Sequence, residues 1–149
     1  MILFRLATRS HARDLSGTGA MLYGGRWNAK GLRMLYTSGN VSLATLEILA
    51  NLSTPHLSKS FYIVEIDLPE SLPIYEPELP EDWNAFPHAQ STIDIGTQFL
   101  KSDEHVCMKV PSAIISTEYN YLLNPLHESF INVKILDIRP MILDQRLVS

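Results

Sequence analysis

The sequence has a single cysteine and no long hydrophobic run. One cysteine, Cys107, excludes an internal disulfide and a metal site built from several thiols. No apolar stretch approaches the ~20 residues that cross a bilayer. Residues 1–10 alternate like a strand and lack the apolar core of a signal peptide. We therefore expect a cytoplasmic protein without a membrane partner, in which Cys107 is a small core residue.

Several common site motifs are also missing. The sequence contains no Walker loop, no GxGxxG motif after a strand, no HExxH and no GxSxG. The five histidines show no metal-ligand spacing, so we expect no metal site. The net charge of −4 argues against direct nucleic-acid binding as the main activity, because neutralising phosphates takes a dominant basic surface.

Length and composition are typical of one folded domain. With 149 residues, the chain can bury roughly two-thirds of its unfolded surface without disulfides or metals. The hydrophobic share of 46% and the charged share of 19% are those of an ordinary globular protein. We expect a single domain over residues 1–149.

Glycine and positive charge are concentrated near the start of the chain. Five of the seven glycines lie between residues 17 and 31, where glycine permits positive φ angles and close approach of the backbone to a ligand. Residues 1–46 also carry six of the 12 lysines and arginines, against one acid, Asp14. A shaped basic segment in an acidic protein favours an anionic ligand.

The hydrophobic pattern predicts several strands and two helices. Strands are expected at Ile2–Ala7, Arg33–Thr37, Phe61–Leu68, His105–Val110, Ala113–Ser116 and Phe130–Ile138, and helices at Val41–Leu52 and from an N-cap at Ser91 to about Lys101. Residues 65–82 hold seven acids and four prolines without a lysine or arginine, and are expected to form an exposed loop. This order lacks regular β-α-β alternation and therefore indicates an α+β fold.

One carboxylate lies on the apolar stripe of the first predicted helix. Glu47 follows Leu43 by four residues and precedes Ala50 by three, in line with Leu46. A carboxylate on a buried face either has a partner or lines a cleft, because burying it alone costs several kcal/mol. The alternative is a stripe edge at which Glu47 reaches water. For Arg5, spacing alone favours a solvated strand face.

The polar motifs together resemble one known family. The motifs are Gly24-Gly25-Arg26-Trp27-Asn28 with Gly31, Leu35-Tyr36-Thr37-Ser38, Leu46-Glu47, Val110-Pro111-Ser112-Ala113 and Asn124-Pro125-Leu126-His127. This combination resembles the RES-domain family, which is named for an arginine, a glutamate and a serine and comprises toxins of bacterial toxin–antitoxin pairs. The resemblance runs from Phe4-Arg5 to about Asp137.

The resemblance implies a fold similar to ADP-ribosyltransferases and cleavage of the nicotinamide–ribose bond of NAD by hydrolysis or phosphorolysis. NAD is then the substrate, and no cofactor is expected. We expect two small, mixed or antiparallel sheets that form a cleft, into which Arg5, Arg26, Tyr36, Glu47 and Ser112 point. The catalytic residues implied are Arg26, Tyr36, Glu47 and Ser112, and the ligand-binding residues are Arg5, Trp27, Asn124 and His127.

The residue types suit this chemistry. Departure of nicotinamide leaves an oxocarbenium-like ribose, which the Glu47 carboxylate would stabilise. The guanidinium groups of Arg5 and Arg26 suit a pyrophosphate. Tyr36 offers a flat face for nicotinamide, and Ser112 offers a hydrogen-bonding hydroxyl.

Partners and alternatives also follow from the resemblance. It implies a cognate Xre-like helix-turn-helix antitoxin that occludes the cleft, and a homodimer. A protein ADP-ribosyltransferase is the close alternative, because it cleaves the same bond and differs only in the acceptor. The basic N-terminal third keeps open a nucleic-acid-binding or RNA-cleaving toxin, and a third alternative is an interaction module whose polar motifs only build turns.

Overall fold

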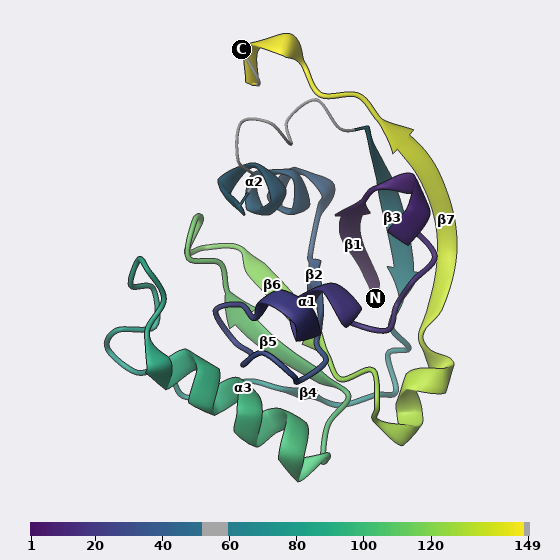
Figure 1. Ribbon diagram of the computed structural model, residues 1–149. Helices are drawn as coiled ribbons and strands as arrows, with labels where there is room; N and C mark the ends of the chain where they lie inside the picture. The colour runs from purple at the N-terminus through teal and green to yellow at the C-terminus, as the bar shows by residue number, and fades with distance from the viewer. Residues whose placement is uncertain (52–59, 148–149) are drawn as a thin grey trace.

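The computed structural model describes residues 1–51 and 60–147 and centres on one sheet (Figure 1). Its strands hydrogen-bond in the order β4-β5-β6-β2-β1-β3-β7. They are β1 (Ile2–Ala7), β2 (Leu35–Ser38), β3 (Phe61–Asp67), β4 (Ile74–Tyr75), β5 (Cys107–Pro111), β6 (Tyr119–Leu123) and β7 (Lys134–Met141). Neighbouring strands are antiparallel except β4 and β5, which are parallel. The α+β class is confirmed.

Helices accompany the sheet at both ends. They are α1 (Thr18–Tyr23), α2 (Val41–Asn51), α3 (Gln90–Ser102) and short 3₁₀ helices at Arg9–His11, Glu128–Asn132 and Gln145–Leu147. None of the helices in the described ranges is long and apolar enough to cross a membrane. In Figure 1, α2 lies near β1 and α3 lies near β4 and β5.

The sheet consists of two halves joined by one residue pair. β1 and β2 are registered only at Phe4 and Ser38. By contrast, β1 pairs with β3 from Ile2 to Ala7, and β2 pairs with β6 from Leu35 to Ser38. The expectation of two small sheets was therefore wrong, because this pair joins both halves into one sheet. Figure 1 shows the half with β3 and β7 turned against the half with β5 and β6.

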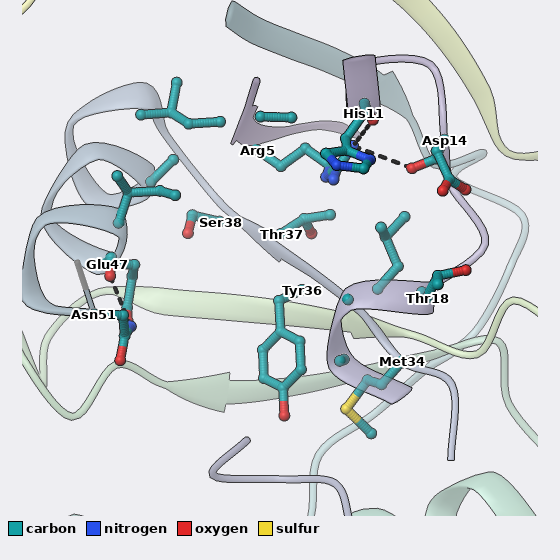
Figure 2. A pocket seen from close by; sticks show the side chains of 18 of the residues that line it. Arg5, His11, Asp14, Thr18, Met34, Tyr36, Thr37, Ser38, Glu47 and Asn51 are labelled. Carbon is teal, nitrogen blue, oxygen red and sulfur yellow. Dashed lines mark hydrogen bonds between the residues drawn. The ribbon is translucent and has the colours of Figure 1, made fainter. Parts of the chain in front are cut away.

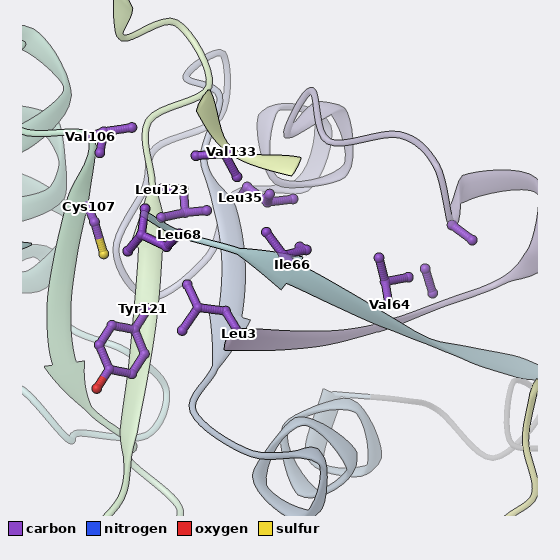
Figure 3. Packing of buried hydrophobic residues seen from close by; sticks show 12 residues of the cluster. Leu3, Leu35, Val64, Ile66, Leu68, Val106, Cys107, Tyr121, Leu123 and Val133 are labelled. Carbon is purple, nitrogen blue, oxygen red and sulfur yellow. The ribbon is translucent and has the colours of Figure 1, made fainter. Parts of the chain in front are cut away.

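The largest hydrophobic cluster fills the space between the two halves (Figure 3). Leu3 and Val64 come from β1 and β3, whereas Cys107 and Leu123 come from β5 and β6, and all four side chains are fully buried. Burial raises the pKa of the Cys107 thiol to about 12, so the thiol stays protonated. The expectation of a core cysteine is confirmed.

Two smaller clusters lie on the opposite side of the sheet, under the helices. Trp27, Met34 and Phe99 belong to the cluster under α3. Leu6 and Ala44 belong to the cluster under α2. Successive strand residues point to opposite faces, so each strand contributes to both sides of the sheet. Residues of both clusters, among them Met34 and Leu6, line one cavity.

Most predicted elements are present with shifted ends. β1 has the predicted bounds, and α2 begins at Val41 as predicted, with the Leu43 N–H donating to the Asn40 side chain at 2.8 Å. The predicted last residue of that helix, Leu52, lies outside the described residues. β7 begins at Lys134 because residues 128–132 form a 3₁₀ helix.

The predicted strand at Ala113–Ser116 was wrong. This segment is a turn, and the strand lies further along, at β6. The Ser112 hydroxyl accepts the N–H groups of Ile114 at 3.0 Å and Ile115 at 3.2 Å. A serine that bonds the next backbone amides in this way competes with strand pairing and favours a turn.

Two details of the helices were also predicted wrongly. The N-cap of α3 is Ala89, because the Ser91 hydroxyl donates to the Asp82 carboxylate at 2.6 Å instead of capping the helix. In α2, Leu46 and Ala50 are exposed, and the buried residues are Leu43, Ala44 and Thr45.

Gly96 of α3 packs against the backbone of Trp27. A Cβ at Gly96 would come 1.5 Å from the Trp27 carbonyl oxygen, so Gly96→Ala should lower the free energy of unfolding by about 3 kcal/mol. Gly19→Ala is the matched control, because a Cβ there meets nothing within 4 Å. Its stability should stay within about 1 kcal/mol of the wild type. Urea unfolding measures both variants, and equal losses would contradict the prediction.

Candidate active site

A cavity of about 730 Å³ opens where β1 and β2 meet (Figure 2). It is lined by residues of β1, β2, α1 and α2, together with His11 and Asp14 from the segment after β1. The strands on its two sides are registered only at Phe4 and Ser38, so the cavity lies at the junction of the two halves of the sheet. Its volume is typical of a site for a small organic ligand.

Glu47 projects from α2 and lines this cavity. Its Oε1 accepts hydrogen bonds from the Ser112 hydroxyl and from the Asn120 side-chain amide, each at 2.7 Å. No hydrogen bond to Oε2 is found among the described residues. Of the two sequence alternatives, the structure supports the first, because Glu47 has partners and also lines a cleft.

Asn120 was missed by the sequence analysis. It lies on β6 and lines the cavity beside Glu47. Because the strand was predicted at Ala113–Ser116, Asn120 was treated as a residue outside a strand. The alternation of Tyr119, Tyr121 and Leu123 with other residues was the signal that could have placed it on a strand next to Ser112.

Arg5 lines the cavity from β1. Its Nη1 donates to the carbonyl oxygens of His11 at 3.3 Å and Asp14 at 3.2 Å. Burial lowers the pKa of the guanidinium, and the charge of the Asp14 carboxylate opposes this effect. In Figure 2 these three residues lie at one side of the cavity and Glu47 lies at another. The solvated strand face that spacing favoured is not what the structure shows.

Tyr36 lines the cavity, but its hydroxyl is used elsewhere. The hydroxyl donates to the Asn28 side chain at 2.6 Å and accepts the Trp27 N–H at 3.1 Å. Burial is the main reason that the pKa of this hydroxyl is raised, so it stays neutral. A Cβ on Gly25 would come 2.7 Å from the hydroxyl, which explains a glycine at that position.

The loop from Gly24 to Gly31 is built around two buried side chains. Trp27 is a core residue with 3% of its surface exposed. The Asn28 amide donates to the carbonyls of Ala20, Ala29 and Leu32, which ties α1 to the loop. Neither Trp27 nor Asn28 is among the residues that line the cavity.

Arg26 was expected to point into the cleft, and the structure places it elsewhere. Its Nη1 donates to the carbonyls of Trp83 at 3.0 Å and Ala85 at 2.8 Å, and it does not line the cavity of the described chain. It therefore joins the glycine-rich loop to the segment before α3. Its charge still acts on Tyr36, where it opposes the rise in pKa.

The Asn-Pro-Leu-His motif forms a turn after β6. The Asn124 amide donates to the Asp103 carboxylate at 3.2 Å, and its side-chain oxygen accepts the Leu126 N–H at 3.0 Å. His127 caps a 3₁₀ helix, because its Nδ1 accepts the Ser129 N–H at 3.0 Å. Neither Asn124 nor His127 lines the cavity. The structure therefore brings Arg5, Tyr36 and Glu47 to the cavity. Ser112 bonds Glu47 but does not line the cavity, and the other predicted residues also lie outside it.

The fold is shared with a solved toxin. The chain superposes on a chain of the crystal structure of the M. tuberculosis MbcT–MbcA toxin–antitoxin complex with a TM-score of 0.73, over 99% of this chain and 88% of that one, at 16% identity. The bent mixed sheet with its cleft is an ADP-ribosyltransferase-like fold.

Sequence comparison gives the family. The RES domain model matches residues 2–144, and the chain belongs to the RES-domain family. It is 40% identical to Toxin Res of Photorhabdus laumondii, over 100% of this chain and 98% of that protein. It is 38% identical to Toxin Res of Yersinia enterocolitica, over 87% and 88% of the two chains. It is 35% identical to the Prs ADP-ribosylating toxin of Sphingobium sp., over 97% and 95%. The suspected resemblance is confirmed.

The Tyr36 hydroxyl anchors the glycine-rich loop, which predicts a loss of stability in Tyr36→Phe. The change leaves the Asn28 oxygen and the Trp27 N–H without this partner, and should cost about 1–3 kcal/mol of unfolding free energy. Tyr23→Phe is the control, because 78% of the Tyr23 surface is exposed. Its effect should stay within about 0.5 kcal/mol. Urea unfolding compares them, and equal stability of the two variants would contradict an anchoring role.

Proposed function

We propose that this chain is a toxin that cleaves the nicotinamide–ribose bond of NAD, with water or phosphate as the acceptor, and so arrests the growth of its own cell. The observation that carries the proposal is the Glu47 carboxylate, which lines the cavity while Ser112 and Asn120 both bond its Oε1. The carboxylate is thereby oriented before a ligand arrives, with Oε2 left for the substrate.

Glu47 acts on the charge that develops during bond cleavage. As nicotinamide leaves, positive charge spreads onto the ribose ring, and a nearby carboxylate stabilises the transition state more than the ground state. The two bonds to Oε1 come from neutral donors, so they orient the carboxylate without cancelling its charge. A preorganised charge of this kind needs no rearrangement at the moment of reaction.

The remaining cavity residues suit the rest of NAD. Arg5 provides a cation for the pyrophosphate, held in place by two backbone carbonyls. The Tyr36 ring provides a flat face for nicotinamide. The bonds of its hydroxyl to the loop hold the ring in place. Arg26 lies outside the cavity and supports the site indirectly, because its Nη1 holds the glycine-rich loop against the segment before α3.

Transfer of ADP-ribose to a protein is the second candidate. The observation that favours it is the 35% identity to the Prs ADP-ribosylating toxin of Sphingobium sp.. The chemistry at Glu47 is the same for both candidates, since only the acceptor differs.

Product analysis tests the proposed function. Purified protein free of antitoxin is mixed with NAD, with and without phosphate, and the products are identified by mass spectrometry. We expect free nicotinamide with ADP-ribose, or with its phosphate ester when phosphate is present. ADP-ribose found only on an added protein acceptor would favour the second candidate, and unchanged NAD in every mixture would refute both.

Glu47→Gln should reduce NAD turnover by about 10²–10³-fold and leave NAD binding nearly unchanged. The glutamine oxygen still accepts from Ser112 and Asn120, so the shape of the site is kept and only the charge is lost. Glu104→Gln is the control, because Glu104 is exposed and lies outside the cavity. Steady-state kinetics on folded variants measure the effect, and near-normal turnover of Glu47→Gln would show that the mechanism is wrong.

We also propose that an Xre-like helix-turn-helix antitoxin covers this cavity and that the free toxin is a homodimer. Two observations support the antitoxin: the solved neighbour with the same fold is a toxin–antitoxin complex, and Arg5 in the cavity favours a carboxylate-bearing segment. Copurification followed by an NAD assay should show loss of cleavage in the complex, and the mass of the free toxin should be that of a dimer. Full cleavage by the complex would contradict occlusion.

A further inference from the structure

The hydrogen bonds around Glu47 continue one residue further into the sheet. The Ser38 hydroxyl bonds the side-chain oxygen of Asn120 at 2.7 Å, and the Asn120 amide nitrogen bonds Glu47 at 2.7 Å. Ser38 is buried on β2, directly opposite Asn120 on β6. Ser38 is also the residue of β2 that pairs with β1. The chain Ser38–Asn120–Glu47 therefore connects the sheet junction to the carboxylate.

The chemistry of the three groups permits only one direction of hydrogen-bond donation along this chain. An ionised carboxylate accepts hydrogen bonds and cannot donate, so the NH₂ end of the Asn120 amide must face Glu47. The oxygen end then faces Ser38, whose hydroxyl must donate. With the amide reversed, two oxygen acceptors would face each other across 2.7 Å, which is repulsive.

We propose that Asn120 is a positioning residue for Glu47 and that Ser38 sets the orientation of Asn120. The inference rests on the proposed function, in which Glu47 stabilises the charged ribose. With Ser112 alone, the carboxylate could rotate about one hydrogen bond. A second donor on the same oxygen, which comes from β6, stops this rotation and fixes the carboxylate where Glu47 lines the cavity.

A purely structural role is the competing explanation. Ser38 and Asn120 lie on paired strands, so their bond could simply stabilise the sheet. The two explanations differ in kinetics. Misplacing a group that acts in the transition state lowers kcat with little change in KM, whereas weakening the sheet lowers the amount of folded enzyme without changing kcat per folded molecule.

The test uses Asn120→Leu, which keeps the branched shape of asparagine and removes the donor without adding a charge beside Glu47. We expect kcat per folded molecule to fall roughly 10–100-fold, with KM changed by less than about twofold. Ser38→Ala should lower kcat by less, because Asn120 keeps its bond to Glu47 and loses only the bond that holds its other end. The double variant should be no slower than Asn120→Leu alone, because Ser38 acts through Asn120.

Ser91→Ala is the matched control. Ser91 also donates its hydroxyl to a side-chain oxygen, that of Asp82 at 2.6 Å, but it lies on α3 away from the cavity. Its kcat should equal that of the wild type. Wild-type kcat in Asn120→Leu, or multiplied losses in the double variant, would overturn the proposal.

A second readout does not depend on NAD cleavage. The side-chain N–H signals of Asn120 are followed by ¹H–¹⁵N NMR in the wild type, in Glu47→Gln and in Ser38→Ala. We expect the proton donated to the carboxylate to move when Glu47 loses its charge, and both protons to change when Ser38 is removed. If the wild type cleaves no NAD, the proposed function fails, while signals unaffected by both changes would overturn the positioning of Asn120.

Discussion

The structure depends on the single registered pair that joins β1 to β2. Phe4 and Ser38 hold the two halves of the sheet together, while each strand is fully paired on its other side. Full pairing of β1 with β2 would close the space between them and remove the cavity. No pairing would release the halves, and the central cluster around Leu3 and Leu123 would be exposed to water. One pair is sufficient because buried apolar side chains supply most of the stabilisation on both sides.

The motif residues divide into two groups with different roles. Glu47, Arg5 and the ring of Tyr36 line the cavity. Trp27 and Asn28 build the loop that supports it: Trp27 fills the core under α3, and Asn28 bonds three carbonyls as well as the Tyr36 hydroxyl. A small domain needs such support, because a carboxylate and a guanidinium that were free to move would lose the orientation in which they meet a ligand.

Part of this arrangement could be predicted from local patterns. β1 and the start of α2 were predicted correctly, because alternation and an asparagine cap act within a few residues. The predicted apolar stripe of α2 was wrong at Leu46, because packing against the sheet buries Ala44 and Thr45 and leaves Leu46 exposed. Arg26 was expected in the cleft because its type suits phosphate, but residue type alone does not show that the carbonyls of a distant segment hold its Nη1.

The sequence by itself determined the α+β class, the basic glycine-rich segment, the family, and Glu47 as the carboxylate of interest. Each of these follows from composition, short-range periodicity or motif. The tertiary structure alone decided which polar groups meet. Glu47 is separated by 65 residues from Ser112 and by 73 from Asn120, yet all three converge at one oxygen atom. Contacts between residues so distant along the chain depend on strand order and register. Burial of the whole core selects this order and register, and short-range sequence patterns do not predict them.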